Sequence, residues 1–289
     1  MVPDPTRARV HTDAAEGWQW ELALRQPSAA LAPYVHELQG YVERSSGQLR
    51  RRELPGLHVV VILEFEPRLR VYANGQETDH ACYAGGFVAG LAGTFTLTEH
   101  FGLQAGIQLN LHPLGARRLF GLPLHELRGH TVHFRDLVAP SERGLNEQLA
   151  ELRDWDARFD LLEHFLWTRL REAAAPNRAV AWALHRIDQA AGAIDLEALA
   201  GELGYSRKHM IALFHDQVGV PPKLWARLVR FARLRRALSE GAPRSWAELA
   251  LQCGYYDQAH LARDVRQFSG GPPRQLLEGL VPGVLAPPE

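Results

Sequence analysis

The sequence predicts an α+β protein of two domains, with a β-rich N-terminal half and an all-α C-terminal half. Three observations lead to this fold class. Short apolar or alternating runs punctuated by glycine fill residues 18–112. Helical hydrophobic spacing replaces these runs in the rest of the chain. A sequence pattern near the C-terminus also occurs twice, and 289 residues are enough for two cores.

Four runs in the N-terminal half predict short strands. Residues 59–63 form a continuous apolar run, and residues 68–72 lead into an Asn74-Gly75 turn. Residues 94–98 and 107–111 alternate between apolar and polar side chains. Short strands separated by glycines are typical of a small barrel or sandwich.

Amphipathic helices are predicted after the strands, over residues 114–120, 141–152 and 156–170. The Ala- and Pro-containing run at residues 173–177 then favours a linker. We therefore place an N-terminal domain at 1–172, a linker at 173–180 and a C-terminal domain at 181–289.

The duplicated pattern predicts two helix-turn-helix units. Its first copy recurs with an offset of 50 for Ala200, Gly204 and Tyr205, and with an offset of 51 for His209, Gly219, Pro221 and Pro222. One residue is thus inserted in the second turn. Residues suited to N-caps precede all four helices, namely Asp195, Ser206, Ser245 and Asp257. Gly204 and Gly254 suit the left-handed stop between the paired helices.

On the second helix of each unit, the positions outside the buried apolar stripe form the face expected to contact DNA. That face holds Arg207, Lys208, Ile211, Ala212 and His215 in the first unit, and Gln258, Ala259, Ala262, Arg263 and Arg266 in the second. Arginine pairs with guanine, glutamine with adenine, and small apolar groups contact the thymine methyl. The alternative to a DNA contact is that each residue is simply a solvated surface residue. The duplication of the helix-turn-helix pattern makes this alternative weakest for Gln258 and Arg263. His260 is included in the DNA-binding set, although its place beside the buried stripe favours packing or a phosphate contact.

A basic helix joins the two units. Residues 222–238 have helical spacing, and such a helix is about 25 Å long. Residues 205–240 carry eight Lys or Arg and two Asp or Glu. Two recognition helices held about one DNA turn, roughly 34 Å, apart would enter successive major grooves. We predict phosphate contacts at Ser206, Arg227, Arg230 and Asp257.

These C-terminal motifs resemble the DNA-binding domain of the AraC/XylS family of bacterial transcription regulators. The resemblance covers about 187–277 and includes the Leu-Ala-x-x-Leu-Gly-Tyr-Ser turn at 199–206 and the Cys-Gly-Tyr-x-Asp-Gln-x-His-Leu-x-Arg string at 253–263. Three departures stand out: Ala212 replaces a frequent family arginine, Val265 replaces the usual phenylalanine, and Tyr256 replaces a small residue. We therefore expect the second recognition helix to discriminate bases more strongly than the first.

The resemblance also implies an architecture and partners for the whole chain. It implies a cupin-like effector barrel with dimerising helices in the N-terminal half. It further implies double-stranded DNA and RNA polymerase as partners, a small-molecule effector, a homodimer, and regulation of transcription by activation or repression. The lack of a signal-peptide core and of a cysteine framework predicts a cytoplasmic protein. The effector, the operator and the sign of regulation are left open by the sequence, and no effector-binding residue is assigned.

Two alternative functions of the N-terminal half would each require a set of clustered side chains. A cupin-like metalloenzyme would need clustered ligands, but the histidines are scattered and no His-x-His with a nearby glutamate occurs. A cysteine-based alkyl-transfer module would need several cysteines, and Cys82 is the only one in this half. We therefore expect no catalytic residue, metal or cofactor.

Composition sets the remaining bounds. The chain has a formal net charge of −1, so the case for DNA rests on local clustering of charge rather than on the total. Its two cysteines give no disulfide framework. The sequence also lacks an apolar run of the roughly 18–20 residues that a membrane span needs. We expect no membrane partner.

Overall fold

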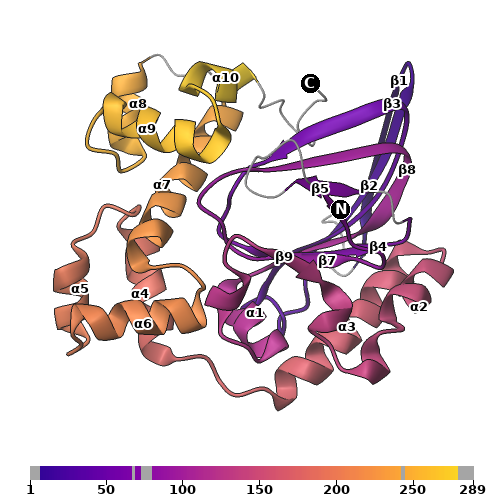
Figure 1. Ribbon diagram of the computed structural model, residues 1–289, viewed down its shortest axis with the longest axis horizontal. Helices are drawn as coiled ribbons and strands as arrows, with labels where there is room; N and C mark the ends of the chain where they lie inside the picture. Colours follow the sequence, from indigo (N-terminus) through magenta and orange to yellow (C-terminus); the bar gives the residue numbers. More distant parts are fainter. Residues whose placement is uncertain (1–6, 67–68, 73–79, 242–244, 279–289) are drawn as a thin grey trace.

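The computed structural model of the chain describes residues 7–66, 69–72, 80–241 and 245–278. A curled antiparallel sheet with helices on one side forms the N-terminal half, and a group of short helices around one long helix forms the C-terminal half (Figure 1). The predicted α+β fold of two domains is confirmed. The expected turn at residues 74–75 lies outside the described residues.

The sheet has nine strands among the described residues, and the main path runs β1-β2-β3-β8-β4-β7-β9. β5 pairs with β8 and with β6. The strands are β1 (Arg9–Ala15), β2 (Trp18–Arg25), β3 (Val35–Glu53), β4 (Val59–Glu64), β5 (Arg70–Tyr72), β6 (Ala81–Cys82), β7 (Phe87–Ala89), β8 (Thr96–Leu111) and β9 (Thr131–His133).

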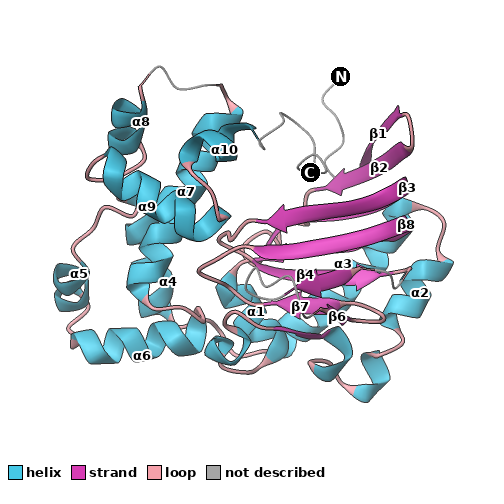
Figure 2. Ribbon diagram, turned by 45° about the horizontal axis from the view of Figure 1, so that its top comes forward, coloured by secondary structure: helices cyan, strands magenta, loops and turns pink. Residues whose placement is uncertain are grey.

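The two longest strands, β3 and β8, pair with each other and form the spine of the sheet (Figure 2). The expected strands at 94–98 and 107–111 are the two ends of β8, which runs without interruption for 16 residues. The pairing shifts register between Ser45 and Gln48. Such a bulge increases the local bend of a strand pair, so one end of β8 pairs with β5 and the other with β4.

Helices cover one face of the sheet (Figure 1). They are α1 (Pro113–Phe120), α2 (Leu145–Glu151) and α3 (Trp155–Glu172), with short 3-10 turns η2 (Leu124–Leu127), η3 (Phe134–Asp136) and η4 (Pro140–Glu142). The expected helix at 141–152 is thus divided between η4 and α2. Leu38, Ile107 and Phe159 are fully buried between sheet and helices. A Cβ at Gly40 would overlap the Trp155 ring, so glycine permits the close approach of α3 to β3.

The C-terminal half consists of α4 (Arg178–Gln189), α5 (Leu196–Glu202), α6 (Arg207–Gln217), α7 (Pro222–Ser239), α8 (Trp246–Gln252), α9 (Gln258–Ser269) and α10 (Pro273–Glu278). The first half of α7 packs with α4 and α6 through Trp225 and Val229. Its second half packs with α8 and α9 through Phe231 and Leu234. α7 is therefore shared by two small helical cores, which it holds apart along its length.

The two halves of the molecule are in direct contact. Arg117 of α1 forms an ion pair with Asp216 of α6 at 3.3 Å. The Gln267 amide of α9 donates to the carbonyl of Gly93 at 3.1 Å. Buried residues form one continuous core from the sheet through α1 and α3 to α6 and α7. The helical half therefore contacts the N-terminal half through both α6 and α9.

Candidate nucleic-acid interface

Both C-terminal units have the capped helices that the sequence predicts. Asp195 accepts from the backbone N–H groups of two residues, at 2.8 and 3.3 Å. The Ser206 and Ser245 hydroxyls and the Asp257 carboxylate each accept from the N–H three residues on. All four N-caps are confirmed. Gly204 and Gly254 are left-handed, with φ of 68° and 82°, as expected of helix stops.

The turn of each unit is held by a tyrosine and a histidine. The rings of Tyr205 and His209 meet edge to face at 4.6 Å, and those of Tyr255 and His260 at 5.4 Å. Burial lowers the pKa of His260. Its ring belongs to the packing of the turn, against the ring of Tyr255. The place of His260 in the DNA-binding set stays a prediction.

The first recognition helix, α6, presents a small polar and apolar surface. Arg207, Lys208 and Ala212 are exposed, and Ile211 is half-buried. The last predicted residue of this face, His215, lies against the sheet domain, with its ring centroid 6.3 Å from that of His125. The outer face of α6 is therefore open at its N-terminal end and covered at its C-terminal end.

The second recognition helix, α9, presents a longer open surface. Gln258, Ala259, Arg263 and Arg266 are exposed, and Ala262 is half-buried. Among the described residues, the Arg263 side chain makes only one long hydrogen bond, 3.4 Å, to the carbonyl of Ala259 one turn earlier. An exposed guanidinium without a carboxylate partner is available for a guanine edge or a phosphate.

Arg227 and Arg230 of α7, both predicted to contact phosphate, have partners inside the domain. Arg227 donates from Nε and NH2 to one oxygen of buried Asp264, at 3.0 and 2.8 Å, and its guanidinium lies 4.9 Å from the centre of the Phe268 ring. Arg230 donates to the Gly192 carbonyl and stacks on Tyr255. The phosphate contacts of both arginines remain predictions, and these bonds give both a structural role that the sequence analysis did not foresee.

A cavity of about 680 Å³ opens inside the curled sheet. Buried Glu43 receives hydrogen bonds from Trp18 and Arg51, and lies 3.2 Å from His100. Burial would raise the pKa of Glu43, but the bonds from Arg51 and His100 outweigh it and lower that pKa to about 2. Part of the cavity lining comes from the helical half, namely Arg235, Ser269, Gly271, Gln275 and Leu276. The cavity is therefore lined by both halves of the molecule.

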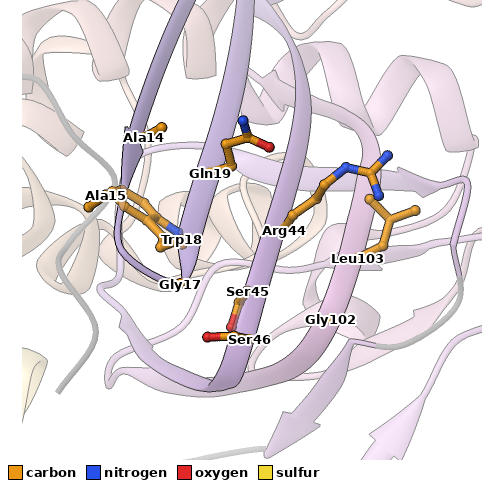
Figure 3. A pocket seen from close by; sticks show the side chains of 10 residues that line it. All are labelled: Ala14, Ala15, Gly17, Trp18, Gln19, Arg44, Ser45, Ser46, Gly102 and Leu103. Carbon is orange, nitrogen blue, oxygen red and sulfur yellow. The ribbon is translucent and has the colours of Figure 1, made fainter.

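A second pocket, of about 500 Å³, lies at the β1–β2 turn (Figure 3). None of its lining residues is buried, and Arg44 is the only charged one. Within the described parts of the chain, no group of three or more His, Cys, Asp or Glu side chains is placed to hold a metal ion. No described helix has both the length and the hydrophobicity to cross a membrane.

Comparison with known families decides the nature of the helical half. A family model described as a helix-turn-helix domain matches residues 199–279. Residues 199–279 are an AraC-type helix-turn-helix domain. This AraC-type domain contains both recognition helices and all of α7. A search of curated proteins finds no match to the chain.

Solved structures give only distant likenesses. A crystal structure of ToxT from Vibrio cholerae is 10% identical and has a TM-score of 0.47, covering 93% of this chain and 100% of that chain. A second ToxT structure, with bound (E)-4-(8-methylnaphthalen-1-yl)but-3-enoic acid, is 9% identical and has a TM-score of 0.48, covering 92% and 100%. A 7S globulin from Momordica charantia has a TM-score of 0.27 at 11% identity, covering 56% and 46%.

Proposed function

We propose that the chain is a sequence-specific DNA-binding transcription regulator whose two recognition helices read successive major grooves. The observation that carries the proposal is the pair of capped helix-turn-helix units joined by α7. At 18 residues, α7 is about 27 Å long. That length is close to one turn of DNA, roughly 34 Å. DNA is the proposed partner, and catalysis plays no part.

Selection of bound sequences from a random duplex pool tests this function directly. The full chain should enrich one defined sequence over the pool. Affinity for that sequence should fall by about 10³-fold or more between about 50 and about 200 mM salt if about six phosphates are contacted. Equal affinity for the enriched and random duplexes would remove the function.

The same proposal includes a small-molecule effector and a homodimer. The cavity supports the effector, because its volume is in the range of ligand sites and its lining includes α7 and α10 residues. A ligand there would touch both halves of the molecule, which gives it a route to α9. Exposed Trp167 on α3 supports an interface between copies, and RNA polymerase is proposed as a partner of the DNA-bound form.

The DNA-binding set that we propose is the one predicted above: Arg207, Lys208, Ile211, Ala212, Gln258, Ala259, His260, Arg263 and Arg266. Ser206, Arg227, Arg230 and Asp257 are proposed phosphate contacts. In the structure Ser206 and Asp257 cap α6 and α9. We keep 1–172, 173–180 and 181–289 as proposed domain bounds. α3 ends at Glu172, and α4 begins at Arg178.

Replacing Arg263 with alanine should weaken binding to the selected sequence by about 1–3 kcal/mol, about 5- to 150-fold. The reason is that the exposed Arg263 guanidinium is the α9 group best suited to a guanine edge. Preference at one base pair should relax, which repeated selection with the variant measures. Lys208→Ala is the matched control on α6 and should weaken all sequences about equally. If Lys208→Ala abolishes selectivity while Arg263→Ala changes nothing, the ranking of the two helices is wrong.

A further inference from the structure

The two turns of the AraC-type domain differ by a single residue. Up to the tyrosine the units correspond at an offset of 50, and the N–H of Tyr205 and that of Tyr255 each donate to the carbonyl of the alanine five residues earlier, both at 2.9 Å. From the N-cap onward they correspond at an offset of 51, since Ser206 and Asp257 both cap their helix through the third N–H. The extra residue is therefore Tyr256.

Among the described residues, the Tyr256 side chain makes no contact that holds the turn together. Its side chain is 84% exposed, the largest value among the exposed large hydrophobic residues of the described chain. Tyr255 and His260 supply the edge-to-face packing that Tyr205 and His209 supply in the first unit. The backbone N–H of Tyr256 contacts His260 Nδ1 at 3.4 Å, a contact that any non-proline residue could make. The aromatic ring is thus not explained by the packing of the fold.

The position of Tyr256 relates the ring to the proposed DNA surface. It directly precedes the N-cap of α9, and the exposed Gln258 and Ala259 follow within three residues. The first residues of a recognition helix meet base edges, so a side chain just before the helix lies at the rim of the groove, beside the sugar-phosphate backbone. A tyrosine there can pack its ring on deoxyribose and donate its hydroxyl to a phosphate oxygen.

We propose that Tyr256 is a DNA-backbone contact that fixes the register of α9 in the major groove. The inference rests on the proposed function, because it requires that α9 enters DNA. It explains the asymmetry of the two units, since α6 follows Tyr205 and Ser206 with no inserted residue. The phenol is uncharged, so it approaches the backbone without adding to the ionic contacts of the neighbouring arginines.

The test uses the full chain and the duplex enriched by selection. Tyr256→Phe should weaken binding about tenfold, because a hydrogen bond to a charged oxygen is lost. Tyr256→Ala should weaken it at least as much. The loss should be equal for the enriched duplex and its single-base variants, and the slope of affinity against salt should not change, because no charge is removed. Phe101→Ala, which removes a 60% exposed aromatic ring from the sheet domain, is the matched control and should bind like the parent.

Duplexes with one methylphosphonate at successive positions identify the contact. At one position near the α9 half of the site, the neutral linkage should weaken DNA binding by the parent. The Tyr256→Phe variant should bind this modified duplex as well as it binds the unmodified one. Parent-like binding by both Tyr256 variants, or a loss confined to a single base pair, would overturn the inference. Failure of the parent itself to prefer the enriched duplex would instead remove the proposed function.

Discussion

Replacing Arg227 with alanine is expected to lower the free energy of unfolding by about 3–5 kcal/mol. The Asp264 side chain is only 4% exposed, and Arg227 supplies both hydrogen bonds to its Oδ1. Without Arg227 a buried carboxylate loses its ion pair, and α7 and α9 lose this polar contact between them. Urea unfolding followed by tryptophan fluorescence measures the change.

Two comparisons separate this role from a role at DNA. The double replacement Arg227→Met with Asp264→Leu should recover most of the lost stability, because no unpaired charge remains. Arg266→Ala, on the exposed side of α9, should change stability by no more than about 0.5 kcal/mol. A fully stable Arg227→Ala that no longer binds DNA would show that Arg227 serves phosphate and not the helix pair.

Replacing Arg51 with methionine should cost a similar amount, about 3–5 kcal/mol, in the sheet domain. Glu43 and Arg51 are both buried, and Arg51 donates from NH1 to Glu43 at 2.7 Å and from NH2 to its other oxygen. The variant would leave the buried Glu43 carboxylate without the positive charge and the two hydrogen bonds of Arg51. Arg44→Met, at an exposed position of the same strand, is the control and should be close to neutral.

The pKa of Glu43 also predicts how stability depends on pH. Hydrogen bonds from Arg51 and His100, acting against burial, lower it from the usual 4.5 to about 2. The charged form is favoured by folding, so the stabilisation is fully present above about pH 4.5 and is lost as the pH falls to about 2. Glu43→Gln should flatten this part of the stability profile. If Glu43→Gln loses as much stability as the parent when the pH falls in this range, other carboxyl groups control that loss.

Local signals in the sequence predicted the parts of the fold that are set locally. The structure has the N-caps, the left-handed glycines and the first residue of α7 at the predicted positions, because hydrogen bonding and backbone sterics determine each of them locally. The apolar run at 59–63 lies within β4 for the same reason. The run of glycines around Gly102 and Gly106 suggested broken strands. Pairing along the whole of β3 instead keeps β8 continuous.

What the sequence could not predict depends on contacts between distant residues. Arg227 and Asp264 are 37 residues apart, and Arg230 and Gly192 are 38 apart, so no local pattern shows that they meet. The basic run of α7 therefore looked wholly available for DNA. The docking of α6 on η2 and the shared lining of the cavity likewise result from packing between the two halves.

The spacing of the two reading elements tests the central claim most directly. The enriched duplex should contain two short conserved elements whose centres are about 10 base pairs apart, as expected if α7 holds α6 and α9 about one DNA turn apart. Inserting about five base pairs between the elements turns one groove to the opposite face of the duplex, and should reduce affinity to that for one element alone. Unchanged affinity after the insertion, or a single conserved element recognised equally well by the Arg263→Ala variant, would contradict reading by both helices.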